Sequence, residues 1–447
     1  MSANPVAAAL MTESRHGTRA HAWYAVSIFM LLYGISYIDR LILSLLAPAV
    51  SAQLHITDTQ MGVLIGLGFG VLYTLTGLPL AHLIDGRRRI PLVVAGVVLW
   101  SLCTIASALA PNFTWLMIFR SGVAIGEAVL SPAAISLIAD LFPRDKRTLP
   151  TAAYTGVSAV MYSGAYIAGG AALQLATVMS GRIDLEPWQL TLILVGLPGL
   201  LLAPLLWVTV PEPPRVGDVE SEQFATAAEA LNYLNKNRLL YGCLLLGNAM
   251  VGMINLAMAS WTPTLLIRGH GMEASQAGYA FGTVGLVSSL IGVVTWPAVV
   301  KFWTNRGRKD ALVLVFTMAL TASWICFTIA GLTRSTTTLL IFAGFGIFFS
   351  AAMGVLVPLL IQLVTPGRMR ARVMALYLTS GSLVGLTVGP PLAALFSEKF
   401  FTGPFAIGSG LALLVLIAGP IGSLTTWAMR KAYRTALVEA EAREAVD

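Results

Sequence analysis

Long apolar segments recur along the chain from Trp23 to Trp427, and short stretches that are charged or rich in Pro and Gly separate them. Each segment has about 18 residues or more, so as an α-helix rising about 1.5 Å per residue it can cross a hydrocarbon core of about 30 Å. The pattern predicts an all-α membrane protein with twelve transmembrane helices. We expect these helices over residues 23–50, 59–83, 90–110, 113–140, 148–178, 188–210, 239–267, 275–300, 311–332, 337–364, 372–396 and 403–428.

The composition also indicates a membrane protein. Of the 447 residues, 57% are hydrophobic and 11% are charged, whereas about a quarter of the residues are charged in ordinary soluble domains. The first twenty residues are polar, and the apolar segment after them contains Asp39 and Arg40, so we do not expect this segment to be a cleavable signal peptide. Cys103, Cys243 and Cys326 lie inside apolar segments, which argues against a disulfide framework.

The basic residues indicate how the chain is oriented in the membrane. Of the 28 Lys and Arg residues, 22 lie in segments on the side of the two termini, four lie on the opposite side, and Arg40 and Arg120 lie inside predicted spans. Basic residues concentrate in cytoplasmic segments. We therefore expect both termini to be cytoplasmic and the chain to be a multi-pass protein of the plasma (inner) membrane. The net charge of +7 follows from this topology and does not indicate binding to nucleic acid.

The longest internal polar stretch, residues 211–238, lies between the sixth and seventh predicted spans. It divides the chain into an N-terminal tail (1–22), a six-helix bundle (23–210), a cytoplasmic linker (211–238), a second six-helix bundle (239–428) and a C-terminal tail (429–447). The basic turn at residues 85–89, after the second span, is echoed at residues 305–309, after the eighth. Duplicated halves of this kind are typical of secondary transporters.

Four charged residues lie at membrane depth, all in the first half: Asp39, Arg40, Arg120 and Glu127. A charged side chain at the middle of a bilayer costs at least about 2.5–3.5 kcal/mol, so the presence of four of them at this depth has to be explained. Their charges sum to zero, and mutual pairing explains how they are tolerated. A buried cluster that only orients two helices is one alternative, but buried ion pairs stabilise proteins poorly compared with apolar packing.

Helix geometry predicts how the four residues meet. Counted from the predicted outer ends of the two spans, Asp39 lies about 17 Å deep, Arg120 about 10 Å and Glu127 about 21 Å. Arg120 and Glu127 are seven residues apart, so they lie on one face of the fourth span and about 10 Å from each other. Asp39 falls between them in depth. If the first and fourth spans are neighbours, Asp39 can contact either Arg120 or Glu127.

This charge pattern suits coupling to protons. Proton coupling needs a carboxylate that is protonated or ionised according to its burial and to the approach of an arginine, and Asp39 and Glu127 are the candidates. An arginine can bind a carboxylate or phosphate on a solute through its planar fork. We expect Arg40 and Arg120 to divide between holding Asp39 and holding the solute.

The second half offers only polar or aromatic positions at membrane depth, which we interpret as helix-packing residues: Asn248, Asn255, Trp261, Ser350, Gln362, Tyr377 and Ser380. A charged half beside an apolar half suits an amphiphilic solute better than a sugar. The sequence contains no Cys/His metal spacing, no phosphate-binding loop and no paired nucleophile and base. We therefore expect no cofactor, no metal and no enzymatic activity. A passive channel or a membrane receptor is a further alternative, and it would not depend on a proton gradient.

The predicted topology and the basic turn resemble the major facilitator superfamily. Within it, two sequence stretches and the end of the fourth span resemble the Spinster family: Tyr37-Ile38-Asp39-Arg40, Arg120-Ser-Gly122-Val-Ala-Ile-Gly126-Glu127-Ala128 and Leu141-Phe142-Pro143. The resemblance implies the major facilitator fold, with two pseudo-symmetric six-helix halves. It covers the first half at the level of the Spinster family and the second half at the level of the superfamily.

The Spinster resemblance implies a monomeric, proton-driven transporter of sphingolipids or lysophospholipids. It implies that Asp39 carries the proton, that Arg40 and Glu127 are coupled to it, and that Arg120 lines the cavity. An exporter of hydrophobic drugs or organic anions is the alternative.

The basic turn implies a cytoplasmic gate formed by Asp85, Arg87, Arg88 and Arg89. The turn departs from the superfamily pattern, because Ala81 replaces the leading Gly and the Asp-Arg-x-Gly run is shortened to Asp85-Gly86.

Overall fold

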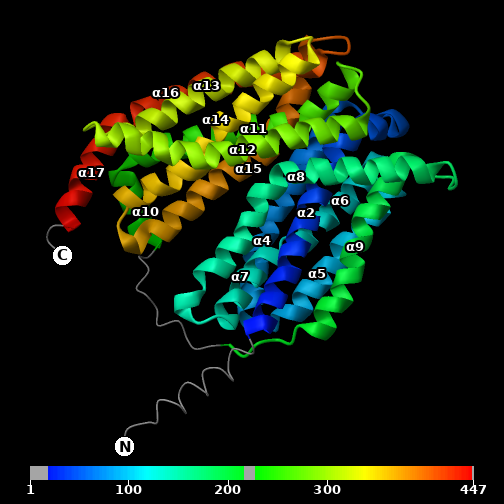
Figure 1. The fold of residues 1–447 in the computed structure, drawn as a ribbon, viewed down its shortest axis with the longest axis horizontal. Helices are drawn as coiled ribbons and strands as arrows, with labels where there is room; N and C mark the ends of the chain where they lie inside the picture. Colours follow the sequence, from blue (N-terminus) through cyan, green and yellow to red (C-terminus); the bar gives the residue numbers. More distant parts are fainter. Residues whose placement is uncertain (1–18, 216–226, 445–447) are drawn as a thin grey trace, which may run out of the picture. The chain divides into compact units, whose positions relative to one another are not determined.

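The computed structural model describes residues 19–215 and 227–444. Within these residues, twelve helical segments are long and apolar enough to span a membrane, and Figure 1 shows the helical fold. The elements of the first half are α2 (Arg19–Leu54), α3 (Asp58–Gly62), η1 (Val63–Gly68), α4 (Phe69–Gly86), α5 (Arg89–Ala108), α6 (Phe113–Glu127), α7 (Leu130–Leu141), η2 (Arg144–Lys146), α8 (Thr148–Ser180) and α9 (Pro187–Thr209). Those of the second half are α10 (Ala227–Lys236), α11 (Arg238–Arg268), α12 (Ala274–Asn305), α13 (Ala311–Leu332), α14 (Thr336–Val364), α15 (Gly367–Phe400), α16 (Ala406–Ala428) and α17 (Arg430–Glu444). The predicted all-α membrane fold with twelve spans is confirmed.

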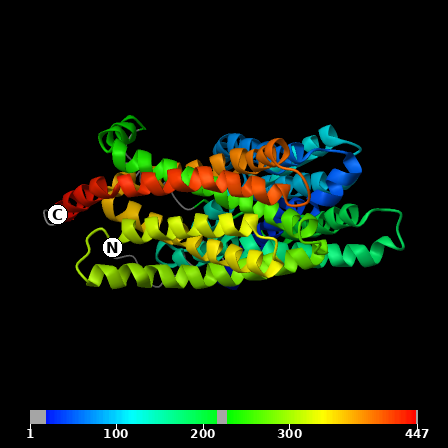
Figure 2. The same ribbon diagram turned by 90° about the horizontal axis from the view of Figure 1, so that it is seen from above.

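Two helices occur in segments where the apolar pattern predicted only a linker and a tail. Helix α10 lies in the predicted linker, and α17 lies in the predicted C-terminal tail. Figure 2 shows α17 continuing past the end of α16 toward the C-terminus. Most of the predicted N-terminal tail (residues 1–18), part of the predicted linker (216–226) and the last three residues (445–447) lie outside the described residues.

The chain divides into two compact units. Unit 1 comprises Met1–Leu54 and Gly68–Asp218, and unit 2 comprises His55–Leu67 and Val219–Asp447. The first part of the second span, α3 and η1, therefore belongs to unit 2, where it packs against α15. A Cβ atom on Gly62 would lie 2.8 Å from the carbonyl oxygen of Pro390, so only glycine allows this approach.

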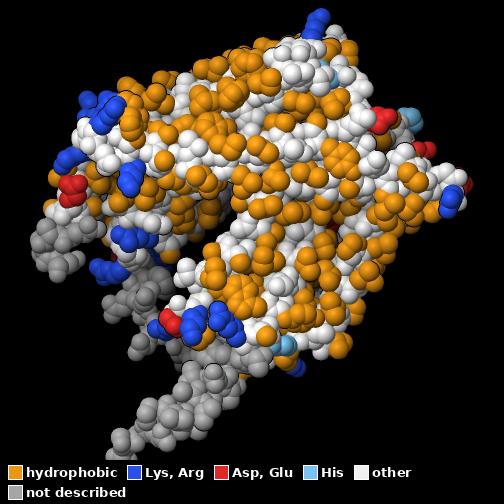
Figure 3. All heavy atoms as spheres, viewed as in Figure 1, with side chains coloured by type: hydrophobic (Ala, Val, Ile, Leu, Met, Phe, Trp, Pro, Cys, Tyr) orange, Lys and Arg blue, Asp and Glu red, His pale blue; other side chains and the backbone are white. Residues whose placement is uncertain are grey.

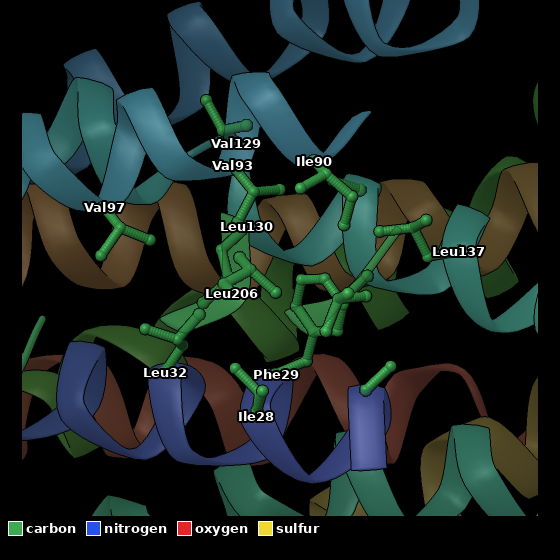
Figure 4. Packing of buried hydrophobic residues seen from close by; sticks show 14 of the residues in the cluster. Ile28, Phe29, Leu32, Ile90, Val93, Val97, Val129, Leu130, Leu137 and Leu206 are labelled. Atoms are coloured by element: carbon green, nitrogen blue, oxygen red, sulfur yellow. The ribbon is translucent and has the colours of Figure 1, made fainter. Parts of the chain in front are cut away.

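Buried apolar side chains of α2, α5, α7 and α9 form the core of unit 1. Figure 4 shows how they point toward one another from these helices. The labelled residues are Ile28, Phe29, Leu32, Ile90, Val93, Val97, Val129, Leu130, Leu137 and Leu206. This packing holds α2 against α7 and α9, and it holds α5 against α6, α7 and α9, so the polar residues of α2, α5 and α6 can meet.

Unit 2 has its own core, formed mainly by α11, α13 and α14. Glycines on α15 let this helix lie close to α11: a Cβ atom on Gly385 would lie 2.7 Å from the carbonyl oxygen of Gly252, and one on Gly389 would lie 2.6 Å from that of Met253. Figure 3 shows hydrophobic side chains covering the visible flank of the helices of unit 2, as expected for a surface in contact with lipid.

Candidate functional site

Asp39 lies on α2 and is almost completely buried, with 1% of its surface exposed. Its Oδ1 accepts a hydrogen bond of 2.7 Å from Nη1 of Arg120 on α6. Nη2 of Arg120 also donates to the main-chain oxygen of Asp39, at 3.1 Å. The predicted contact between Asp39 and the fourth span is therefore present. The sequence allowed either Arg120 or Glu127 as the partner of Asp39, and in the structure the partner is Arg120.

Thr104 on α5 is a third member of this site, and the sequence pattern does not predict it. Its hydroxyl is fully buried and contacts Oδ2 of Asp39, and it also lies 2.9 Å from the main-chain oxygen of Trp100. A hydroxyl has one hydrogen, so it can donate fully to only one of these two acceptors at a time, while its oxygen can also accept a hydrogen bond. Threonine in an apolar helix commonly bonds its own backbone, so the sequence carries little signal for this role.

Glu127 on α6 forms the second ion pair of the site. Its Oε2 accepts a hydrogen bond of 2.8 Å from Nη2 of Arg40 on α2. Three aromatic rings surround the guanidinium of Arg40, with their centroids 5.3 Å (Tyr37), 4.8 Å (Phe69) and 4.9 Å (Tyr73) from its central carbon. Aromatic faces attract a cation at these distances. Arg40 is therefore held in place by the rings as well as by Glu127.

The chain around Glu127 explains how this side chain is positioned. Helix α6 ends at Glu127 and α7 begins at Leu130. Pro132 has no N–H, so it cannot donate to the carbonyl of Ala128, and this missing bond coincides with the break in the fourth span. Gly126 lets the span approach α5 closely, since a Cβ atom there would lie 2.6 Å from the carbonyl oxygen of Gly96.

The four charged residues thus form two ion pairs rather than one cluster around Asp39. Asp39 and Arg40 are consecutive, so their side chains leave α2 about 100° apart and reach different partners. Arg120 and Glu127 lie on one face of α6, two helical turns apart. The site is electrically neutral when both carboxylates are ionised. Adding one proton leaves one arginine without its counter-charge, so protonation changes which groups the arginines can bind.

The basic turn after the second span is divided between buried and exposed residues. Arg89 is 1% exposed; it contacts Asp140, and its Nε donates to Oε1 of Glu212 at 2.8 Å. Arg87 and Arg88 are exposed. The side chain of Asp85 lies outside what the structure describes. The segment after α9 is therefore fastened to the start of α5 through Arg89 inside unit 1.

Several of the polar residues singled out in the second half bond to neighbouring helices. Nδ2 of Asn248 on α11 donates to the main-chain oxygen of Tyr377 (2.6 Å) and to the hydroxyl of Ser380 (3.1 Å), both on α15. Nε1 of Trp261 donates to the main-chain oxygen of Pro390 at 2.9 Å. These contacts fit the helix-packing role expected from the sequence. Across residues 19–215 and 227–444, no group of three or more His, Cys, Asp or Glu residues could hold a metal ion.

A family model described as "Major Facilitator Superfamily" matches residues 29–386, which includes all of this site. The chain belongs to the major facilitator superfamily. It is therefore a membrane transporter and not an enzyme.

Within the superfamily, a relative described as an "MFS-type efflux pump" from Mycolicibacterium smegmatis is 28% identical over 441 residues, which cover 96% of this chain and 97% of the relative. A relative from Xenopus tropicalis, described as the sphingosine-1-phosphate transporter SPNS2, is 25% identical over 411 residues, which cover 87% of this chain and 77% of the relative.

A solved structure has the same fold. The crystal structure of a bacterial homologue of the human lysosomal transporter Spinster, in an inward-facing and unoccupied conformation, matches with a TM-score of 0.82. It is 24% identical, and the match covers 95% of this chain and 99% of that chain. The predicted resemblance to Spinster proteins is confirmed.

Proposed function

We propose that the chain is a proton-coupled secondary active transporter that moves an amphiphilic or lipid-like solute by alternating access. The observation that carries the proposal is the presence of two buried ion pairs in unit 1, Asp39 with Arg120 and Arg40 with Glu127. Charged groups at membrane depth are costly, and buried ion pairs stabilise a fold poorly compared with apolar packing. Movement of protons gives a reason for keeping four charged residues there.

Protonation of Glu127 frees Arg40 to bind the solute. Once Glu127 is neutral, it no longer balances the charge of Arg40, while the three surrounding rings continue to hold the guanidinium. The guanidinium can then bind an anionic head group through two parallel hydrogen bonds. Arg40 suits this role better than Arg120, because 18% of its side chain is exposed against 3% for Arg120.

Asp39 gains and loses its proton with little rearrangement of its neighbours. Arg120 also bonds the main-chain oxygen of Asp39, so it keeps one contact in both protonation states. Thr104 donates to the ionised carboxylate. When the carboxylate is protonated at Oδ2, its O–H donates to the hydroxyl oxygen of Thr104, and the hydrogen of Thr104 turns to the main-chain oxygen of Trp100. Thr104 is therefore a positioning residue for Asp39.

An amphiphilic solute fits the uneven distribution of charge along the chain. The first half supplies the arginines for an anionic head group, and the second half has no charged residue at the predicted membrane depth. The similarity to a sphingosine-1-phosphate transporter supports a sphingolipid or lysophospholipid solute.

Export of hydrophobic drugs or organic anions is the second candidate function. The similarity to an efflux pump along nearly the whole chain favours it. The same two ion pairs would couple either solute to protons, so the two candidates differ only in what Arg40 and its surroundings bind.

Exposed Arg87 and Arg88, with Asp85, form the cytoplasmic gate, while buried Arg89 holds the turn in shape. The transporter works as a monomer in the plasma membrane, with both termini in the cytoplasm.

Transport into proteoliposomes separates the two candidate functions. Uptake of a fluorescent lysophospholipid, a sphingoid phosphate and a hydrophobic dye is measured with and without an imposed pH gradient. We expect gradient-dependent uptake of the lipids, with the lipids competing against the dye. Gradient-driven dye transport that neither lipid inhibits would favour the exporter, and lipid uptake that is indifferent to the gradient would contradict proton coupling.

A further inference from the structure

Basic side chains gather at the end of unit 2 where α12 is followed by α13 and where α17 begins. Figure 3 shows Lys and Arg side chains concentrated there. The turn after α12 is shaped by Gly307, whose φ of 79° favours glycine. We call the following residues the basic patch: Lys301, Arg306, Arg308, Lys309, Arg430, Lys431 and Arg434.

Asp310 joins the two segments that supply the basic patch. It precedes α13, is 3% exposed, and accepts hydrogen bonds from Arg430 and Arg434 of α17. Burial opposes the ionisation of Asp310, but the hydrogen bonds and charges of the two arginines outweigh it and hold its pKa below the ordinary value. α17 is therefore fastened beside the turn, and the two segments present one surface.

Aromatic rings lie under two arginines of the turn after α12. The guanidinium carbon of Arg306 lies 4.0 Å from the ring centroid of Phe302, and that of Arg308 lies 5.5 Å from the ring centroid of Trp303. Phe302 is 51% exposed. A guanidinium stacked on a ring keeps its N–H edges available to donate two parallel hydrogen bonds to an anion such as phosphate. A Trp at the end of a span, such as Trp303, lies at the level of the lipid head groups.

The basic patch carries more positive charge than the neighbouring chain neutralises. Asp310 is bound by Arg430 and Arg434, and Glu441 lies 3.6 Å from Lys309. Arg306 and Arg308 have no ion-pair partner within residues 19–215 and 227–444. Two stacked guanidiniums thus remain available for an external anion.

We propose that the basic patch binds the phosphate of an anionic phospholipid of the surrounding membrane. Clusters of Lys and Arg beside a transmembrane helix attract anionic lipids. The exposed Phe302 at the end of α12 favours a lipid over a soluble phosphate, because a ring at this position contacts the acyl chains below the head group while Arg306 binds the phosphate above it.

Native mass spectrometry of the purified full-length chain tests the proposal. The protein in a neutral detergent receives phosphatidylglycerol or phosphatidylcholine with the same acyl chains. We expect preferential binding of phosphatidylglycerol. The double variant R306Q/R308Q loses roughly fivefold in affinity for each guanidinium, or roughly 25-fold in total. R308Q alone should lose roughly fivefold in affinity for phosphatidylglycerol. It replaces the double variant in the test if the double variant does not fold, as judged by its melting temperature without added lipid.

Arg334 provides a matched control, because it also lies over an aromatic ring, 5.7 Å from the centroid of Phe405, in the loop between α13 and α14. R334Q should bind phosphatidylglycerol as the unmodified protein does. Equal binding of the two lipids, an equal loss in R334Q, or displacement of phosphatidylglycerol by millimolar inorganic phosphate would overturn the proposal. None of these outcomes depends on transport.

Discussion

Replacement of Thr104 by Val tests how Asp39 is controlled. Valine has the same β-branched shape as threonine, so the substitution keeps the shape of the fully buried side chain and removes its hydroxyl. The ionised carboxylate then keeps Arg120 but loses its hydrogen bond at Oδ2. The groups that face or adjoin Asp39 are Arg120 and Glu127 from α6, Cys103 from α5, and Arg40 from α2 itself, and all of them remain.

The size of the effect follows from the two protonation states. A hydrogen bond to an ionised group contributes about 1.5–3 kcal/mol and one between neutral groups about 0.5–1.5 kcal/mol. The loss is therefore larger for the ionised form by about 1 kcal/mol, and about 1.4 kcal/mol corresponds to one pH unit. We expect the midpoint of the pH profile of gradient-driven transport to move to higher pH by about 0.5–1 unit.

The assay is the initial rate of solute uptake by proteoliposomes, measured over a series of pH values. Thr104→Ser keeps the hydroxyl and should keep the original midpoint. Thr191→Val is the matched control, because Thr191 is also fully buried in unit 1 but its hydroxyl bonds only the main chain of Pro187. A lower rate with an unchanged midpoint in Thr104→Val would refute the positioning role and indicate a packing defect.

Two further predictions concern stability. Gly126→Ala places a Cβ atom 2.6 Å from the carbonyl oxygen of Gly96. We expect it to lower the free energy of unfolding by about 1–3 kcal/mol and to lower the melting temperature in a fluorescence thermal-shift assay. Gly77→Ala is the control, because a Cβ atom there meets no atom within 4 Å, and it should melt as the unmodified protein does. Asp310→Asn removes a carboxylate whose pKa is lowered in the folded protein, so it should lower the free energy of unfolding by about 2 kcal/mol at neutral pH. This difference should vanish as the pH falls below the ordinary value of 3.8 and through the lower value of the folded protein. The exposed Asp184→Asn should have no effect, and an Asp310→Asn protein as stable as the original would contradict the fastening of α17.

Simple physical features of the sequence were enough to predict the spans and the contact between Asp39 and the fourth span. The spans follow from the length of apolar segments, and the contact follows from depth along two helices. Depth alone could not decide between Arg120 and Glu127, because it does not fix how each helix is rotated about its axis. Asp39 pairs with Arg120 because the adjacent Arg40 leaves α2 in another direction and pairs with Glu127.

Other features of the site depend on tertiary packing and have no signal in sequence spacing. Thr104 is one of many threonines in apolar helices, and its contact with Asp39 depends on how α5 packs in the core of unit 1. The rings around Arg40 come from α2 and α4, so their convergence is not visible in sequence spacing. The assignment of residues 55–67 to unit 2 also depends on tertiary packing. The break in the fourth span, by contrast, could have been predicted from Pro132.

Gradient-driven transport by Asp39→Asn tests the central claim most directly. Asparagine keeps the size of the side chain and cannot take up or release a proton. Proteoliposomes containing Asp39→Asn, the control Asp184→Asn or the unmodified protein are compared with and without an imposed pH gradient. We expect Asp39→Asn to lose the acceleration by the gradient while the control keeps it. Full gradient-driven transport by Asp39→Asn would contradict the assignment of proton coupling to Asp39.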